Sequence, residues 1–108
     1  TASRPIFLSS WIWSAGVKGV VLDDVLPEKV DFLKVDIDGS EPRALKGLIK
    51  TFERNPQLKM VIEYYPEVQI KLGNKPAEMM AILDKYFTYE KIPGDYNEEY
   101  YNLICTRK

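Results

Sequence analysis

The chain has 108 residues, 45% of them hydrophobic, which suits one domain with a core of its own. Fifteen lysines and arginines nearly balance sixteen aspartates and glutamates, so the net charge of −1 provides no field to attract nucleic acid or anionic lipid. Histidine is absent, which excludes Ser-His and Cys-His nucleophilic pairs and most zinc sites. Any chemistry would therefore fall to carboxylates, lysines and tyrosines.

Two features favour a cytoplasmic protein without a membrane span. The apolar stretch from Ile6 to Trp13 is too short to cross a membrane and lacks the basic flank of a signal peptide. We expect it to be core or partner-facing structure. The lone cysteine, Cys105, lies in an apolar run, where we expect a buried thiol and not a nucleophile.

The first elements along the chain are short. Val17 to Val21 is a candidate strand, and Leu22 to Leu26 is a candidate helical turn ended by Pro27. Two apolar, β-branched runs bounded by turn formers then predict buried strands, one from Val30 to Ile37 and one from Met60 to Tyr65.

A helix is predicted between these two strands. Ser40 can cap it, Glu41 places negative charge at its positive end, and Pro42 suits its first turn. The helix is expected to stop near Asn55-Pro56. One of its faces is apolar at helical spacing: Ala44, Leu45, Leu48, Ile49 and Phe52.

The strand–helix–strand order predicts a parallel βαβ unit in a sheet covered on both faces. A short helical piece from Pro66 to Leu72 and a helix from Pro76 to Phe87 should follow. The segments Thr88 to Ile92 and Tyr100 to Thr106 then predict a closing antiparallel hairpin. The buried side of the second helix should carry Met79, Ile82, Leu83 and Tyr86. The fold class is thus α/β, with a parallel βαβ core and a C-terminal antiparallel hairpin in a single domain spanning residues 1–108.

Acidic residues gather where the predicted strands end. In an open parallel sheet the binding crevice lies beyond the carboxyl ends of the strands. Asp36, Asp38 and Glu41 occupy that place on the first core strand, and Glu63 approaches it on the second. Neighbouring strands lie about 4.8 Å apart, so these carboxylates can converge on one proton or one cation.

A purely structural interpretation competes with this one. Asp38-Gly39-Ser40 is also what a tight strand-to-helix turn with a capping residue requires. Asp36 is less easily explained so, because an acid at the end of an apolar strand is paired or functional. Lys34 is the obvious structural counter-ion for Asp36 or Glu63.

Four segments follow one another at a characteristic spacing: Val21-Leu22-Asp23-Asp24-Val25-Leu26, then Val30-Asp31-Phe32-Leu33-Lys34-Val35-Asp36-Ile37-Asp38-Gly39-Ser40-Glu41, then Leu45-Lys46-Gly47, and finally Val61-Ile62-Glu63. Their order and spacing resemble those of the FkbM-type methyltransferases, and the resemblance is strong from Val21 to Glu63. Asp38 stands where that family usually has Glu.

The resemblance implies a class I methyltransferase with a Rossmann-like sheet, of which this chain would form a part. Such an enzyme moves a methyl group from S-adenosylmethionine to an oxygen, often a hydroxyl of a sugar or another small molecule. Asp36 would end the fourth strand beside the methyl group and the acceptor, and Asp36 and Ile37 would touch the cofactor. Asp38 and Glu41 would line the same mouth, and Glu63 would end the fifth strand. A carboxylate there can draw off the hydroxyl proton or hold a cation. The resemblance leaves a divalent metal open and implies no protein metal ligands.

The chain also departs from that family. The glycine-rich turn and the ribose-binding acid of class I methyltransferases are missing, because Gly16 and Gly19 flank no strand–glycine–helix unit. We therefore expect the chain to correspond to the C-terminal half of such an enzyme and to be inactive alone. Its partner would be the missing N-terminal half or another copy.

Two other functions remain open. Leu33 to Ser40 also resembles the hydrophobic strand and D-x-D-G-[ST] motif of haloacid-dehalogenase-like phosphatases, with Asp36 as nucleophile, Asp38 as acid/base and Mg²⁺ as cofactor, although no later acidic pair ends a strand. A non-enzymatic half-domain is the third interpretation, since a sheet cut before its first strand exposes an edge. That edge could be covered by Phe7, Trp11 and Trp13. The tyrosines Tyr96, Tyr100 and Tyr101 are expected to be ordinary hairpin residues.

Overall fold

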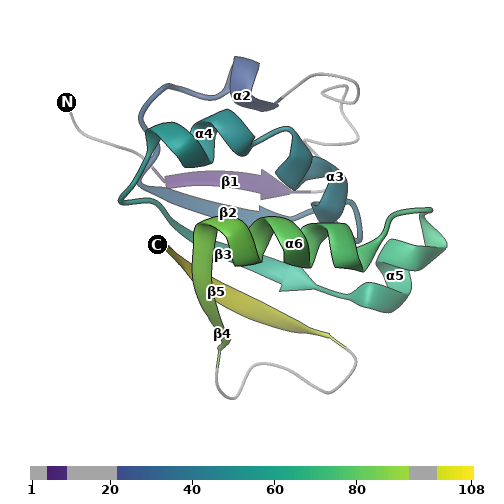
Figure 1. Ribbon diagram of the computed structural model, residues 1–108. Helices are drawn as coiled ribbons and strands as arrows, with labels where there is room; N and C mark the ends of the chain where they lie inside the picture. The colour runs from purple at the N-terminus through teal and green to yellow at the C-terminus, as the bar shows by residue number, and fades with distance from the viewer. Residues whose placement is uncertain (1–4, 10–21, 93–99) are drawn as a thin grey trace.

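The computed structural model describes residues 5–9, 22–92 and 100–108, and within them a five-stranded sheet has the order β1-β2-β3-β5-β4 (Figure 1). The strands are β1 (Pro5–Ser9), β2 (Phe32–Asp36), β3 (Lys59–Tyr64), β4 (Phe87–Lys91) and β5 (Tyr101–Arg107). The helices are α2 (Leu22–Val25), α3 (Glu41–Lys46), α4 (Ile49–Arg54), α5 (Pro66–Lys71) and α6 (Pro76–Tyr86). None of these helices is long or apolar enough to cross a membrane.

The sheet has a parallel half and an antiparallel half. Strands β1, β2 and β3 run parallel, whereas β5 is antiparallel to both β3 and β4. The parallel βαβ core and the C-terminal antiparallel hairpin are therefore confirmed. The arrow tips of β1, β2 and β3 point to the same edge of the sheet, beside α5 and the loop that leads into α3 (Figure 1).

The first strand was not predicted. Pro5–Ser9 forms β1 and pairs in parallel with β2, with Phe7 opposite Lys34. The edge of β2 is therefore covered within the chain by β1, which contains Phe7, one of the three residues expected to cover it. Leu8 points into the core and is 6% exposed, while Phe7 on the opposite side is 55% exposed and its ring lies 6.5 Å from that of Phe32. The candidate strand Val17 to Val21, and Trp11 and Trp13, lie outside the described residues.

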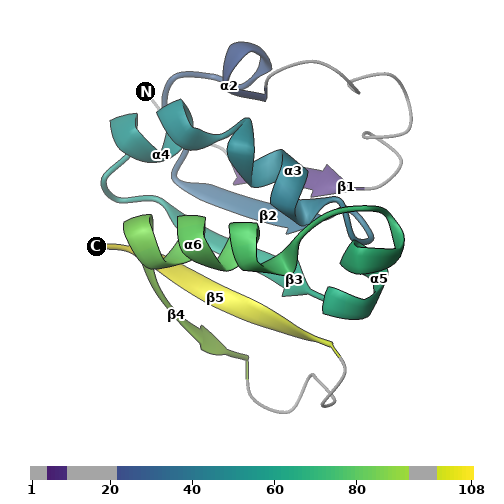
Figure 2. The same ribbon diagram turned by 45° about the vertical axis from the view of Figure 1, so that its right-hand side comes forward.

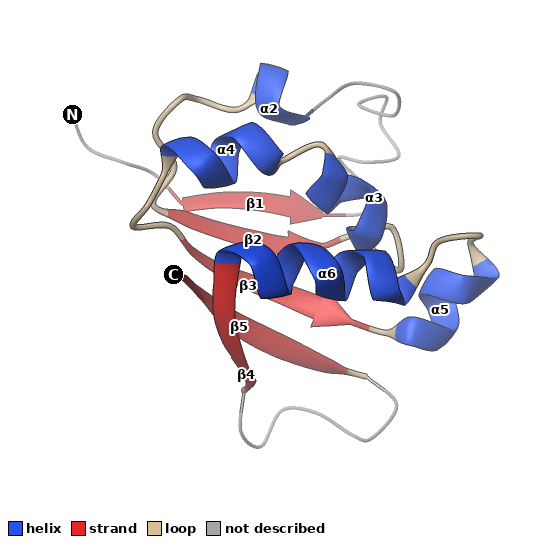
Figure 3. Cartoon of the chain, viewed as in Figure 1, coloured by secondary structure: helices blue, strands red, loops and turns tan. Residues whose placement is uncertain are grey.

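The described helices lie over one face of the sheet, so the expectation of cover on both faces was wrong for this part of the chain (Figures 1 and 2). Figure 3 shows the sheet as one layer and α3, α4 and α6 as the other. Burial alternates accordingly along β2, where Leu33 and Val35 are buried and Lys34 and Asp36 are exposed. The alternate side chains of each strand point to the opposite face of the sheet, which is more open to solvent.

The core lies between the sheet and these helices. On α6, Met79, Leu83 and Tyr86 are buried as predicted, and Ile82 is partly buried against them. Cys105 on β5 faces the same core and is 0% exposed. Burial raises the pKa of its thiol to about 12, which confirms the expectation of an unreactive buried cysteine.

The predicted single helix after β2 is in fact two helices. Gly47 and Leu48 separate α3 from α4, and the carbonyl of Gly47 accepts a 2.8 Å hydrogen bond from Asp23 N–H. A methyl group at Gly47 would lie 3.2 Å from the backbone nitrogen of Leu22, so the helix is interrupted where α2 approaches it closely. The prediction of one continuous helix was wrong because the spacing of apolar residues does not depend on this tertiary contact.

The carboxylate of Asp23 caps α4 from outside the helix. It accepts hydrogen bonds from Lys50 N–H at 3.0 Å, Thr51 N–H at 2.8 Å and the Thr51 hydroxyl at 2.7 Å. These bonds satisfy backbone donors that the first turn of a helix otherwise leaves without partners.

Asp23→Ala is expected to lower the free energy of unfolding by about 2 kcal/mol, because it removes charge-assisted hydrogen bonds and a helix cap together. Urea unfolding followed by circular dichroism measures this change. Asp24→Ala is the matched control, since Asp24 is the exposed neighbour on the same helical turn. Equal losses in the two variants would contradict the capping role.

Candidate acidic site at the strand ends

The turn after β2 is shaped by Glu41. Oε2 of Glu41 accepts a hydrogen bond from Ile37 N–H at 3.0 Å, and Oε1 accepts one from Gly39 N–H at 2.9 Å. Its side chain is 0% exposed. Ser40 is the N-cap residue of α3, but its side chain makes no capping hydrogen bond, so its predicted role was wrong. The side chain of Glu41, one residue later, binds the backbone N–H groups of the turn instead.

Helix α5 holds the same turn from the other side. Asn74 Nδ2 donates a 3.0 Å hydrogen bond to the carbonyl of Gly39, and Val68 and Leu72 pack against Gly39. Because α5 follows β3 directly, this contact ties the loop beyond β2 to the segment beyond β3. The carboxyl ends of the two strands are thereby fixed relative to each other.

Three carboxylates converge at this end of the sheet. Oxygen atoms of Asp36, Glu41 and Glu63 all lie within 4.8 Å of one another. Strands β2 and β3 pair in register up to Val35 and Ile62, so Asp36 and Glu63 are the next residues of adjacent parallel strands. The predicted meeting of Asp36 and Glu63 at a shared rim is confirmed as geometry.

The environment of Glu63 favours its protonated form. Partial burial and then the negative charges of Asp36, Glu41 and Asp38 raise the pKa of Glu63 to about 7. Burial also raises the pKa of Glu41, against the lowering effect of its hydrogen bonds to backbone N–H groups.

No positive side chain relieves this crowding within the part of the chain that the structure describes. The ion pairs there lie elsewhere, between Lys46 and Glu78 and between Lys71 and Glu67. Lys34, predicted as the counter-ion of Asp36 or Glu63, pairs with neither, and that prediction was wrong. Lys34 projects into solvent from the middle of β2, one row of side chains before Asp36.

Comparison with known proteins identifies the family. The Methyltransferase FkbM domain matches residues 14–91, more than half of the chain. The chain belongs to the FkbM methyltransferase domain family. Among curated proteins, none matches it. The family match spans β2, β3 and the acidic end of the sheet, as the resemblance of the motifs predicted.

In this FkbM domain the other predicted site residues differ in their setting. Asp38 is exposed in the turn, with a positive φ of 50°, and is not among the three converging carboxylates. Ile37 is 2% exposed, its N–H donates to Glu41, and its carbonyl accepts from Ser40 N–H at 3.2 Å. The cofactor role assigned to Ile37 stays a prediction.

The acidic group of the FkbM domain could hold one proton or one divalent cation. Glu41 already uses both oxygens to accept backbone N–H groups, which leaves Asp36 and Glu63 as the carboxylates open to a ligand. Asn102 lies opposite Glu63 on β5 and was missed by the sequence analysis. No local spacing could have found it, because β5 reaches β3 only through a long-range pairing.

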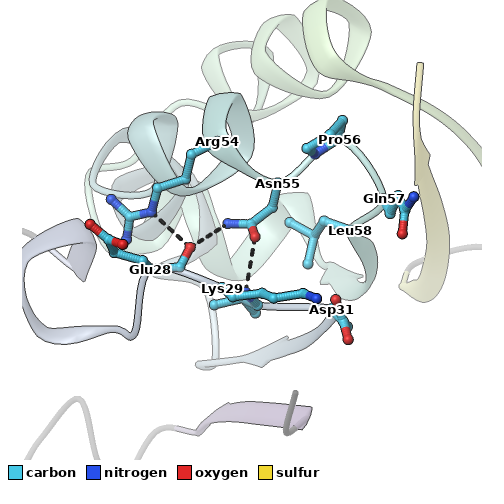
Figure 4. A pocket seen from close by; sticks show the side chains of 9 residues that line it. Glu28, Lys29, Asp31, Arg54, Asn55, Pro56, Gln57 and Leu58 are labelled. Carbon is cyan, nitrogen blue, oxygen red and sulfur yellow. Dashed lines mark hydrogen bonds between the residues drawn. The ribbon is translucent and has the colours of Figure 1, made fainter. Parts of the chain in front are cut away.

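A separate hollow of about 530 Å³ lies at the amino ends of β2 and β3, away from the acidic group (Figure 4). It lies between residues 28–31 and 54–58. Asn55 Oδ1 accepts a hydrogen bond from Val30 N–H, and Asn55 Nδ2 donates to the carbonyls of Glu28 and Thr51. The guanidinium of Arg54 donates to the carbonyls of Glu28 and Pro27. These bonds brace the loops that form the hollow, so its most deeply placed polar groups are structural.

Glu63→Gln is expected to stabilise the FkbM domain at neutral pH but not at acidic pH. Glu63 has a pKa of about 7 in the folded state and 4.5 as its ordinary value, so the folded state binds more protons between these pH values. The free energy of unfolding of the wild type therefore falls as pH rises from 4.5 to 7. Because the side chain is only half-buried, we expect the difference between variant and wild type to grow by about 1 kcal/mol over this range.

Thermal or urea unfolding at a series of pH values from 4 to 8 measures this difference. Glu90→Gln, on the exposed strand β4, controls for the loss of one negative charge. A constant difference between Glu63→Gln and wild type at every pH would contradict the raised pKa.

Proposed function

We propose that this FkbM domain provides the acceptor side of an S-adenosylmethionine-dependent O-methyltransferase that acts on a hydroxyl group of a small molecule or sugar. One observation carries the proposal: Asp36 and Glu63 meet at the carboxyl ends of two adjacent parallel strands, and the pKa of Glu63 lies near neutrality. Membership of the methyltransferase family supports it further. The phosphatase interpretation has no comparable support.

The chemistry asks two things of these residues. A hydroxyl oxygen becomes a better nucleophile when a base takes its proton during attack, and a base works best when its pKa lies near the working pH. In the proposal Glu63 takes this proton and Asp36 accepts a hydrogen bond that orients the acceptor. S-adenosylmethionine, when bound, supplies the methyl group: a C–O bond forms, the C–S bond breaks, and its electron pair stays on sulfur.

The described residues fit the acceptor better than the methyl donor. Asp36 is the one predicted cofactor contact with an exposed side chain, because Ile37 is buried. Among the described residues, the turns that lead from β2 into α3 and from β3 into α5 hold at most one glycine, so neither is the glycine-rich turn that binds a nucleotide cofactor. We therefore propose that this polypeptide by itself binds S-adenosylmethionine weakly or not at all and transfers no methyl group.

Three measurements test the proposal. Calorimetric titration of the chain with S-adenosylmethionine should show no binding in the micromolar range, and micromolar affinity would overturn the division between donor and acceptor sides. The natural full-length gene product should transfer the methyl group of labelled S-adenosylmethionine to hydroxyl acceptors as methyl ethers. Hydrolysis of p-nitrophenyl phosphate with Mg²⁺, lost in Asp36→Asn, would instead favour the phosphatase.

A further inference from the structure

Two tyrosines stack at the end of the sheet next to Glu63. The rings of Tyr65 and Tyr100 have centroids 4.8 Å apart and an interplanar angle of 19°. Tyr65 follows the last residue of β3, and Tyr100 precedes the first residue of β5. The pair therefore extends the ladder in which Glu63 faces Asn102 and Tyr64 faces Tyr101.

The tyrosine pair shares a face with the acidic residues. Side chains alternate along a strand, so residues two apart point to the same side. Tyr65 lies two residues beyond Glu63, and Tyr100 lies two residues before Asn102. Asp36 is adjacent to Glu63 on the neighbouring strand. The stacked tyrosines, here called the aromatic wall, therefore share one face of the sheet with the acidic rim, which contains Asp36 and Glu63. The described helices lie over the other face (Figure 2).

This wall is accessible. Tyr100 is 39% exposed, and Tyr65 behind it is partly buried. An aromatic ring presents a negative π-face, which attracts the partly positive C–H groups on one face of a sugar ring. The neighbouring carboxylates and the amide of Asn102 are hydrogen-bond partners for hydroxyl groups.

The charge of the rim restricts what can bind. Asp36, Asp38 and Glu63 are acidic, and no described lysine or arginine pairs with Asp36 or Glu63. An acceptor with a carboxylate or phosphate beside this rim would meet like charges, which repel strongly in a partly desolvated site. An uncharged ring that carries several hydroxyl groups meets no such penalty.

We propose that Tyr100, backed by Tyr65, is the stacking wall for the acceptor, and that it selects an uncharged polyhydroxylated ring with an apolar C–H face over anionic rings. This inference rests on the proposed function, since it takes Asp36 and Glu63 as the acceptor side of the site. It replaces the expectation that Tyr100 is an ordinary hairpin residue. Tyr100 is a specificity-determining residue here, with no role in proton transfer.

The test is saturation-transfer difference NMR on the chain without any methyl donor. Methyl β-D-glucopyranoside is the neutral probe, and methyl β-D-glucuronide is the same ring with a carboxylate. The neutral glycoside should bind with saturation confined to one C–H face, and the glucuronide should bind about tenfold more weakly. Tyr100→Ala should weaken binding of the neutral glycoside roughly fivefold, and Tyr100→Phe should retain it.

Tyr100→Leu guards against a folding defect, because it keeps the apolar bulk and loses the π-face; it should lose affinity as Tyr100→Ala does. Wild-type affinity in Tyr100→Leu, equal affinity for the two glycosides, or no binding of the neutral glycoside would each overturn the inference. Since the measurement needs no S-adenosylmethionine, its failure is distinct from a failure of the proposed function. Glycoside binding without methyl transfer by the full-length protein would sink only the proposed function.

Discussion

Glu63→Gln is expected to lower kcat for methyl transfer by the full-length protein about a hundredfold, the usual contribution of a positioned general base. The amide keeps the size of the side chain and its place beside Asp36, but it cannot accept the hydroxyl proton. Steady-state kinetics with labelled S-adenosylmethionine measure the change. If Glu63 acts only by binding the acceptor, KM should rise while kcat stays near the wild-type value, which would contradict its role as a base.

The pH profile adds a second criterion. With a pKa of about 7, Glu63 is mostly protonated at pH 6 and mostly ionised at pH 8, so wild-type kcat should rise across this interval and then level off. The profile of Glu63→Gln should lose this step. Glu67→Gln is a suitable control because Glu67 is an exposed residue of α5, four positions further along the chain. A rise of the same shape in Glu63→Gln would assign the titration to another group.

The meeting of Asp36 and Glu63 could be predicted because it follows from two robust properties of the sequence. Each residue occupies one of the last two positions of a short strand with apolar, β-branched residues, and an amphipathic helical segment connects the two strands. A right-handed crossover then makes the strands parallel and places their carboxyl ends at one edge. This placement depends only on the order and direction of the strands, so it holds whether the connecting segment is one helix or two.

The interruption of the helix at Gly47 could not be predicted from the spacing of apolar residues. Apolar residues recur at helical spacing on both sides of Gly47, and periodicity alone predicts one continuous helix. The interruption arises because the Gly47 carbonyl accepts a hydrogen bond from Asp23 N–H, while the Asp23 carboxylate caps the next helix. These partners are far apart in the sequence and meet only in the folded chain, so no local sequence pattern predicts their contact.

Glu41 and Lys34 illustrate a second limit. Their charges suggested a site residue and a counter-ion, yet Glu41 is committed to backbone N–H groups of its own turn and Lys34 projects into solvent. The sequence identifies a carboxylate but not the hydrogen-bond donors that will surround it. The predicted cap was Ser40, whereas the side chain that braces the turn belongs to the next residue, Glu41. The structure thereby separates the four predicted acids: Asp36, Glu41 and Glu63 converge, Glu41 is engaged by the turn, and Asp38 is exposed outside the cluster.

Gly39→Ala is expected to destabilise the domain by about 3 kcal/mol, because two costs coincide there. Gly39 has a φ of 97°, a conformation that disfavours any residue with a Cβ atom. A methyl group on it would also lie 2.6 Å from Cγ1 of Val68 and 3.0 Å from Cδ1 of Leu72. Helix α5 would have to move away from the turn, which would release the carboxyl ends of β2 and β3 from each other.

Gly73→Ala separates the two costs. Gly73 follows the end of α5 with a φ of 81°, but a methyl group there would meet nothing within 4 Å. It should therefore cost only about 1 kcal/mol, the penalty of the left-handed backbone conformation. In a Val68→Ala background the additional cost of Gly39→Ala should shrink, because the nearest clashing atom is gone. If both glycine variants lose the same stability by urea unfolding, the close approach of α5 does not hold the acidic turn in place, and the geometry that joins Asp36 to Glu63 must come from the strand pairing alone.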